Sequence, residues 1–340
     1  FTRNKSIRSF DELEYFTGLT QLSSPSNNGQ FIGCSNLKSV KLPISITFLG
    51  SNSFNGCDLE EIVIPDNVTD VGYYNTFQNN KRLKRIVMPK SVTKGGESNF
   101  FNGTSLEEIV FRGNLRNYNI YWSVSNWKYK TEDNELYVEK DGVIYNKDYT
   151  TVCLASPSTK IPNFEGVTTI EGSAFSYNQD GGDIIIPESV TSLGSDVFKG
   201  CINIEKIEIN ASINISQSRL ISGCISLKEL ILGDNVVGVT GGGSGWNDFS
   251  FTEGCSKLEK VKWSRKATSI PYHCFSDKSL LTFDNIEGLE NVTSFGGYSF
   301  ANCPLLGKFI VNENVTDLNF SRGGGSRGIF YGTDLTYILC

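Results

Sequence analysis

The amino-acid sequence predicts a β-rich solenoid, a right-handed coil of repeats about 23–25 residues long with short parallel strands. The first observation behind this fold class is the motif Phe-x-Gly-Cys, which occurs at Phe31, Phe54 and Phe198. Looser copies continue the series, and the steps from Phe31 to Phe54 and from Phe54 to Phe77 are 23 residues each. Such a period is typical of solenoids, in which each coil packs only against its neighbours.

The second observation is a strand pattern that precedes each copy of the motif. The segment Leu59–Ile64 follows the order L-x-x-I-x-I, in which alternation turns the Leu and Ile side chains inward. Pro65 ends this strand because it has no N–H to donate to a neighbouring strand, and the Val-Thr pair at 68–69 suits a second short strand. Glycines follow where the chain must turn, and we predict positive φ at Gly50, Gly72 and Gly194.

The repeat also predicts which side chains fill each coil. The motif Phe lies in the interior beneath the loop, and a cysteine follows it three residues later. Because they share one position, we expect a buried column of free thiols that behave as small hydrophobic side chains, at Cys34, Cys57, Cys201, Cys224, Cys255 and Cys303. The chain has no Cys-x-x-Cys pair, which argues against a structural zinc site.

The repeat divides the chain into four stretches of one continuous solenoid. Residues 1–30 form an N-terminal cap, 31–113 a first repeat block, 114–160 irregular repeats with a β-hairpin, and 161–340 a second repeat block. A helix over 10–16, acidic in its first turn, is expected to cover the open end of the core, and Asp141-Gly142 predicts the hairpin turn. Because the chain starts without Met and stops inside a strand motif, we expect it to be truncated at both ends.

The order Pro, Val-Thr, Gly, Phe and Cys at these offsets resembles the BspA-type leucine-rich repeat, and the resemblance covers nearly the whole chain. The hairpin resembles the irregular variant of that family, which precedes a new run of repeats. The resemblance implies a secreted or surface-held bacterial protein, and several members of the family serve in adhesion.

Composition and motifs exclude several other functions. A net charge of −6 and a pI near 5.1 argue against nucleic acid as a partner, because nucleic acid selects a basic surface. No apolar run approaches the roughly 18 residues that span a bilayer, so we expect no direct membrane insertion. His273 is the single histidine, and its neighbour Cys274 points to the opposite face of an extended chain, which argues against a thiol–imidazole pair. We therefore predict no catalytic residue, no cofactor and no metal.

One face of the strands is a candidate binding surface. The residue between the last two inward positions faces outward, and in three consecutive coils it is Val63, Val87 and Val110. Beside these valines, charged pairs alternate in sign from coil to coil, which favours pairing between neighbouring strands. An exposed apolar ribbon is typical of a docking face, although β-branched residues also suit strands for their propensity alone.

Two further candidates lie in the longer loops, which all occur between the Val-Thr segment and the next motif Phe and so project from one edge. Tyr73 and Tyr74 are expected to form the rim of the docking face. Trp246 follows a glycine run and is a candidate ligand contact, with flexible filler as the alternative interpretation of its loop.

Three hypotheses about function remain open. The first is a non-enzymatic extracellular binding or adhesion protein that presents its repeat surface to a macromolecular ligand, a protein or a glycan. The second is a structural spacer or an assembly component of a cell surface or virion. The third, a glycoside hydrolase, is supported only by scattered carboxylates.

Overall fold

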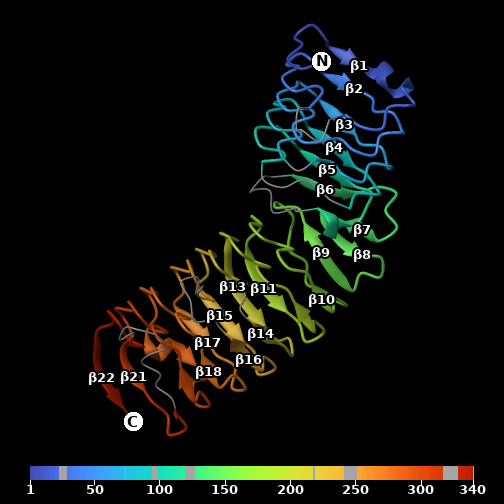
Figure 1. Cartoon of the computed structure of the whole chain (residues 1–340). Coiled ribbons are helices and arrows are strands. Elements are labelled where there is room, and N and C mark those ends of the chain that lie inside the picture. The colour runs from blue at the N-terminus through green and yellow to red at the C-terminus, as the bar shows by residue number, and fades with distance from the viewer. Residues whose placement is uncertain are drawn as a thin grey trace. The chain divides into compact units, whose positions relative to one another are not determined.

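A computed structural model describes residues 1–22, 29–72, 74–93, 99–118, 127–216, 219–240, 251–316 and 328–339. The chain forms two compact units, Phe1–Lys147 and Asp148–Cys340. In each unit the strands of successive coils lie side by side in parallel, and helix is confined to three short 3-10 turns among the described residues (Figure 1). The prediction of a parallel β-rich solenoid is confirmed.

A short helix lies near the start of the first unit. The 3-10 helix η1 spans Asp11–Tyr15 and buries Leu13, where the sequence predicts a helix over 10–16. The unit contains two parallel sheets, β1–β2 and β3–β4–β5–β6. Their strands are β1 (Ser9–Phe10), β2 (Ser39–Val40), β3 (Glu61–Val63), β4 (Arg85–Met88), β5 (Glu108–Phe111) and β6 (Lys128–Thr131). The short helix η2 (Leu115–Asn117) lies between β5 and β6.

The predicted hairpin closes the first unit. Strands β7 (Tyr137–Lys140) and β8 (Val143–Asn146) pair antiparallel. Asp141 and Gly142 between them have φ values of 52° and 81°, which is the backbone of a type I′ turn. The Asp-Gly pair therefore has the structural role that the sequence predicts.

In the second unit each regular coil supplies two strands, as the Leu-Ile and Val-Thr segments predict. The first ladder is a five-stranded parallel sheet of β11 (Gly182–Ile186), β13 (Ile204–Ile209), β15 (Glu229–Leu232), β17 (Lys260–Lys262) and β19 (Ile286–Glu287). The other strands of the coils form three separate parallel groups: β9 (Thr151–Ala155), β10 (Thr169–Ile170) and β12 (Ser192–Leu193); β14 (Asn214–Ser216) and β16 (Gly238–Thr240); and β18 (Ser269–Ile270) and β20 (Ser294–Phe295). Helix η3 (Phe283–Asn285) and the pair β21 (Gly307–Ile310) and β22 (Leu335–Leu339) complete the unit.

The motif phenylalanines stack on one another in the interior. The rings of Phe31, Phe54 and Phe77 are fully buried, with centroids 5.4 and 5.7 Å apart and planes within 4°. In the second unit, Phe175 and Phe198 repeat this arrangement at 5.8 Å. The coil-to-coil distance thus sets the ring spacing, and the predicted interior position is confirmed.

The cysteine column is buried as predicted, and its thiols also donate hydrogen bonds. Cys57 Sγ donates to the carbonyl oxygen of Phe31 in the preceding coil at 3.1 Å, and Cys201 Sγ donates to that of Phe175 at 3.1 Å. Burial raises the pKa of both thiols to about 12, so they remain protonated donors at neutral pH. Asn80 takes the same position in another coil, and its amide donates to Phe54 O at 2.7 Å. This position is therefore not restricted to cysteine.

The glycine predictions are right for two positions and wrong for the third. Gly50 and Gly72 have φ values of 80° and 87°, which only glycine adopts without strain. Gly194 does not have positive φ. A Cβ there would lie 2.2 Å from the backbone nitrogen of Gly172. Glycine is therefore required at 194 by the close approach of two coils, which a single repeat unit does not reveal.

Candidate functional site

The sheet face of the first unit is covered by ion pairs. Arg85 on β4 contacts three carboxylates: Nη1 lies 2.5 Å from Glu61, Nε 2.9 Å from Glu108, and Nη2 3.2 Å from Glu132. Arg85 lies opposite Glu61 and Glu108 in the sheet register, so the alternation of charge predicted from the sequence is a cross-strand pairing.

The expected apolar ribbon is wrong for two of its three valines. Val63 is 43% exposed, but Val87 and Val110 are only 1% and 2% exposed. Long arginines on the same strands can account for this burial: Arg85 extends to Glu132 beyond the neighbouring strand, and Arg112 meets the same carboxylate at 2.8 Å. Long charged side chains cover apolar surface with their aliphatic stems. Alternation alone therefore does not predict the exposure of these valines.

The predicted rim is only partly within the described residues. Tyr74 is exposed, as expected of a loop tip. Tyr73 and Trp246 lie outside the described residues. The structure thus locates Val63 and Tyr74 as exposed candidates on the first unit.

An aromatic cluster lies on the second unit, formed by Tyr272, His273, Tyr298 and Tyr331. The His273 and Tyr298 rings stack at 4.8 Å with 23° between their planes. Tyr272 meets His273 edge-on at 4.4 Å, and Tyr331 meets Tyr298 edge-on at 5.4 Å. Tyr331 is 60% exposed, and the other three rings are half-buried. Four rings from three successive coils therefore share one accessible surface.

The backbone holds the two central rings at a fixed corner of the coil. The N–H of His273 donates to Gly297 O at 3.1 Å, which aligns His273 with Tyr298 in the next coil. Both residues are left-handed, with φ values of 56° and 57°. Coils of the first unit have asparagine at this corner, also left-handed, at Asn52, Asn75 and Asn99. Asparagine adopts this conformation easily, whereas tyrosine does so uncommonly. The local backbone conformation therefore does not explain why residue 298 is a tyrosine.

A polar pair borders the cluster. The Asn302 amide donates to Asp277 Oδ1 at 2.8 Å, and both residues are exposed. Gly332, directly after Tyr331, lies against this pair, since a Cβ on it would be 2.2 Å from Asn302 Oδ1. The surface thus combines ring faces with an adjacent carboxylate and amide.

Sequence reasoning missed this cluster. The sequence suggested His273 only as a partner for Cys274. In the structure the thiol of Cys274 is buried, whereas the ring of His273 is half-buried. The signal was present: His273 and Tyr298 each stand two residues before a motif Phe, at Phe275 and Phe300. Aligning the repeats at this offset would have brought the two rings together.

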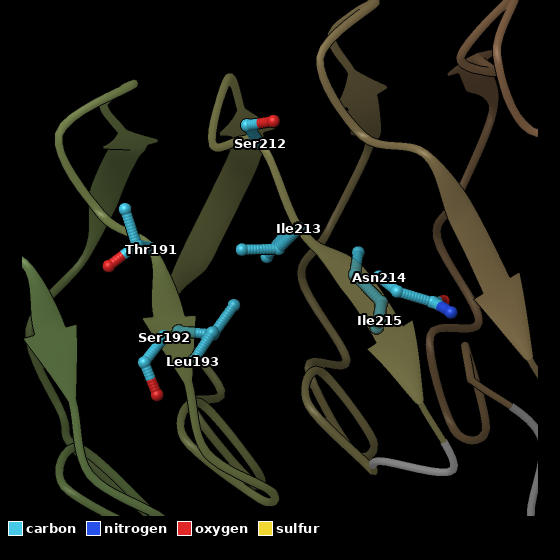
Figure 2. A pocket seen from close by; sticks show the side chains of 7 residues that line it. All are labelled: Thr191, Ser192, Leu193, Ser212, Ile213, Asn214 and Ile215. Atoms are coloured by element: carbon cyan, nitrogen blue, oxygen red, sulfur yellow. The ribbon is translucent and has the colours of Figure 1, made fainter.

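A gap between β12 and β14 forms a pocket of about 290 Å³, into which the side chains of Leu193 and Ile213 point (Figure 2). Its cause is a shortened corner: five positions separate Ile186 from Thr191, but only four separate the aligned Ile209 from Ile213. The N–H of Ile213 donates back to Ala211 O at 3.0 Å, and within the described residues no strand pairing joins β12 to β14. The pocket is thus the result of one missing residue rather than of a set of converging polar groups.

Neither a metal site nor a membrane span is found in the described part of the chain. No three His, Cys, Asp or Glu side chains there are placed to hold a metal ion. Among the same residues, no helix has the length and apolar character needed to cross a bilayer.

Comparison with known proteins identifies the family. The model of the BspA type leucine-rich repeat region matches six copies over residues 10–123, 144–241 and 244–322. No curated protein matches the chain.

Among solved structures, a leucine-rich repeat protein of Eubacterium ventriosum is 18% identical, with a TM-score of 0.54 over 93% of this chain and 81% of that one. A leucine-rich repeat protein of Bacteroides ovatus is 22% identical, with a TM-score of 0.53 over 95% and 76%. A leucine rich cell surface protein of Faecalibacterium prausnitzii is 25% identical over 79% of this chain, with a TM-score of 0.39, and the match spans 57% of its length. The first two likenesses show the fold, and the repeat model, which matches most of the sequence, shows that the chain belongs to the BspA-type leucine-rich repeat family.

Proposed function

We propose that this chain is a non-enzymatic binding protein, held at a cell surface or secreted, that presents the aromatic cluster to a macromolecular ligand. The observation that carries the proposal is the gathering of Tyr272, His273, Tyr298 and Tyr331 on one accessible surface. Large rings lose little side-chain entropy on binding and are enriched at the energetic centres of interfaces. A spacer needs no such surface. The proposed surface location is supported by the family to which the chain belongs.

Four carboxylates of the chain are poor candidates for the general acid of the glycoside hydrolase alternative. A general acid of that class needs a carboxyl with a raised pKa. The Lys84 ammonium donates to Glu107 and lowers the pKa of that carboxyl, and Arg112 does the same for Glu132. Hydrogen bonds from Asn210 and Arg265 lower the pKa of Glu208 and Asp234. These four groups therefore stay ionised at neutral pH and serve as partners for donors.

The candidates predicted from the sequence are secondary contacts in this proposal. On the first unit, Val63 and Tyr74 are exposed. Tyr73 and Trp246 keep the roles expected from the sequence. Val87 and Val110 are buried and therefore do not contribute to the proposed contact surface.

The proposal is tested by comparing the whole chain with a cluster variant on an array of extracellular-matrix proteins, mucins and purified glycans. The cluster variant carries Tyr272→Ser, His273→Asn, Tyr298→Asn and Tyr331→Ser. We expect the wild type to bind at least one class of probe and the variant to lose that binding, because the rings supply most of the contact area.

Tyr177→Asn is the matched control. Tyr177 is 39% exposed and left-handed, at a coil position where Asn79 and Asn302 are left-handed as well, and it lies outside the aromatic cluster. This variant should bind as the wild type does. Equal binding by the wild type and the cluster variant, or no binding by the wild type to any probe, would contradict the proposal.

A further inference from the structure

We infer that the aromatic cluster, together with the Asp277–Asn302 pair, binds an uncharged saccharide; this inference rests on the binding function proposed above. The juxtaposition on which it stands is a row of rings beside a polar pair on one accessible surface. A sugar ring has the complementary chemistry, because one of its faces is lined with C–H groups and its rim with hydroxyls.

The ring faces suit the apolar face of a sugar. Aromatic faces carry partial negative charge and attract the partly positive hydrogens of C–H groups. Tyr331 is 60% exposed and stands at 89° to the Tyr298 ring, so its faces are not stacked on that neighbour. Tyr272 is likewise edge-on to His273, at 84°. Tyr272 also meets Tyr298 edge-on at 5.9 Å, so it contacts both central rings, and Tyr331 contacts Tyr298 from the next coil. The four rings belong to three coils, which provides contact for an oligosaccharide rather than for a single sugar.

The polar pair suits the hydroxyl rim. A carboxylate accepts several hydrogen bonds, and an amide both donates and accepts. The hydrogen bond from Asn302 to Asp277 fixes the two side chains against each other. Their remaining hydrogen-bond donors and acceptors are therefore held in a defined direction for a ligand. Gly332 brings this pair next to Tyr331, because any side chain at 332 would collide with Asn302.

Charge selects an uncharged ligand. Asp277 contributes an exposed carboxylate to this surface, and Lys278, which follows it in the sequence, is buried. The whole chain carries a net charge of −6. Phosphorylated or sulfated ligands are therefore repelled, as like charges are at close range. A quaternary ammonium group needs ring faces arranged around one point, whereas His273 and Tyr298 turn a face toward each other.

The variants for the test keep the fold. Tyr298→Asn installs the residue that Asn52, Asn75 and Asn99 provide at the same left-handed corner, so it removes the ring without disturbing the backbone. Tyr331→Ser removes an exposed ring. Tyr177→Asn is again the control, and the thermal midpoint of each variant confirms that it is folded.

The experiment is calorimetric titration of the whole chain with neutral hexasaccharides of glucose, galactose and mannose, with hyaluronan and heparin fragments, and with choline. We expect one neutral hexasaccharide to bind, with little change between about 0.05 and 0.5 M salt. Tyr298→Asn and Tyr331→Ser should each weaken that binding by roughly tenfold or more, the size of effect that loss of one stacking ring produces. Tyr177→Asn should leave it unchanged.

Several results would overturn the inference: no binding of any neutral hexasaccharide, binding of the acidic fragments or choline alone, or neutral binding that the two ring variants do not weaken. The binding function is judged separately. If the cluster variant loses a protein ligand on the array while no saccharide binds, the saccharide inference is wrong and the proposed function stands.

Discussion

Replacing Phe198 with alanine is expected to lower the free energy of unfolding by about 3–5 kcal/mol. The ring is fully buried, stacks on Phe175 at 5.8 Å and meets Phe164 edge-on at 6.5 Å. Its removal leaves a cavity between coils whose spacing is fixed by the hydrogen bonds of the strands, so the surroundings have little freedom to collapse. In a solenoid such a loss also weakens the contact between neighbouring coils.

Denaturant unfolding followed by intrinsic fluorescence measures this change. Leu305→Ala is the control, because Leu305 is an exposed apolar residue of the same unit and its loss should change stability by less than about 0.5 kcal/mol. If Phe198→Ala lowered the free energy of unfolding by less than about 1 kcal/mol, the ring would not be the interior support described above.

Lys278→Met is expected to stabilise the chain by about 1–4 kcal/mol at neutral pH, the range seen when buried ion pairs are replaced by apolar residues of similar volume. Lys278 stands three residues after Phe275, the position that cysteine takes in other coils, and it is only 2% exposed. Its Nζ donates to Ser276 O at 2.5 Å, and no carboxylate within the described residues pairs with it. Burial lowers the pKa of this ammonium below its ordinary value of 10.5.

The sign of the pH dependence follows from that pKa. Between the lowered pKa of the folded chain and 10.5, the unfolded chain binds more protons than the folded one, so the stability contributed by Lys278 rises with pH. The advantage of the methionine variant should therefore be largest at neutral pH and shrink as the pH approaches 10.5. Denaturant midpoints of both proteins across this range test it. If the stability advantage of the methionine variant did not vary with pH, the destabilisation by Lys278 would not come from burial of its protonated ammonium.

Features carried by one residue type with one physical role were predictable from the sequence. The motif Phe, the column cysteine and the Asp141-Gly142 turn each lie where the repeat places them. The spacings between motif residues in successive repeats already predict these positions, and the resemblance to the family adds no further one. For such residues the period alone fixes the side chain's surroundings, because neighbouring coils supply the same contacts.

Features that depend on particular side chains in two or three coils were not predictable in this way. Alternation predicts that Val87 and Val110 face outward and are exposed, whereas in the structure both are buried beside the ion pairs of Arg85. The aromatic cluster requires His273 and Tyr298 to be aligned across coils before it can be recognised. The gap at β12 and β14 follows from one residue fewer before Ile213, which is visible in the sequence once strands are aligned.

The central claim, that the ligand binds the aromatic cluster rather than the sheet face, is tested most directly by hydrogen–deuterium exchange of the whole chain with and without the ligand selected on the array. We predict slower exchange at 271–275, 296–300 and 328–332, the segments that carry the four rings. Protection confined to β3, β4 and β5, with no change in those three segments, would contradict the account.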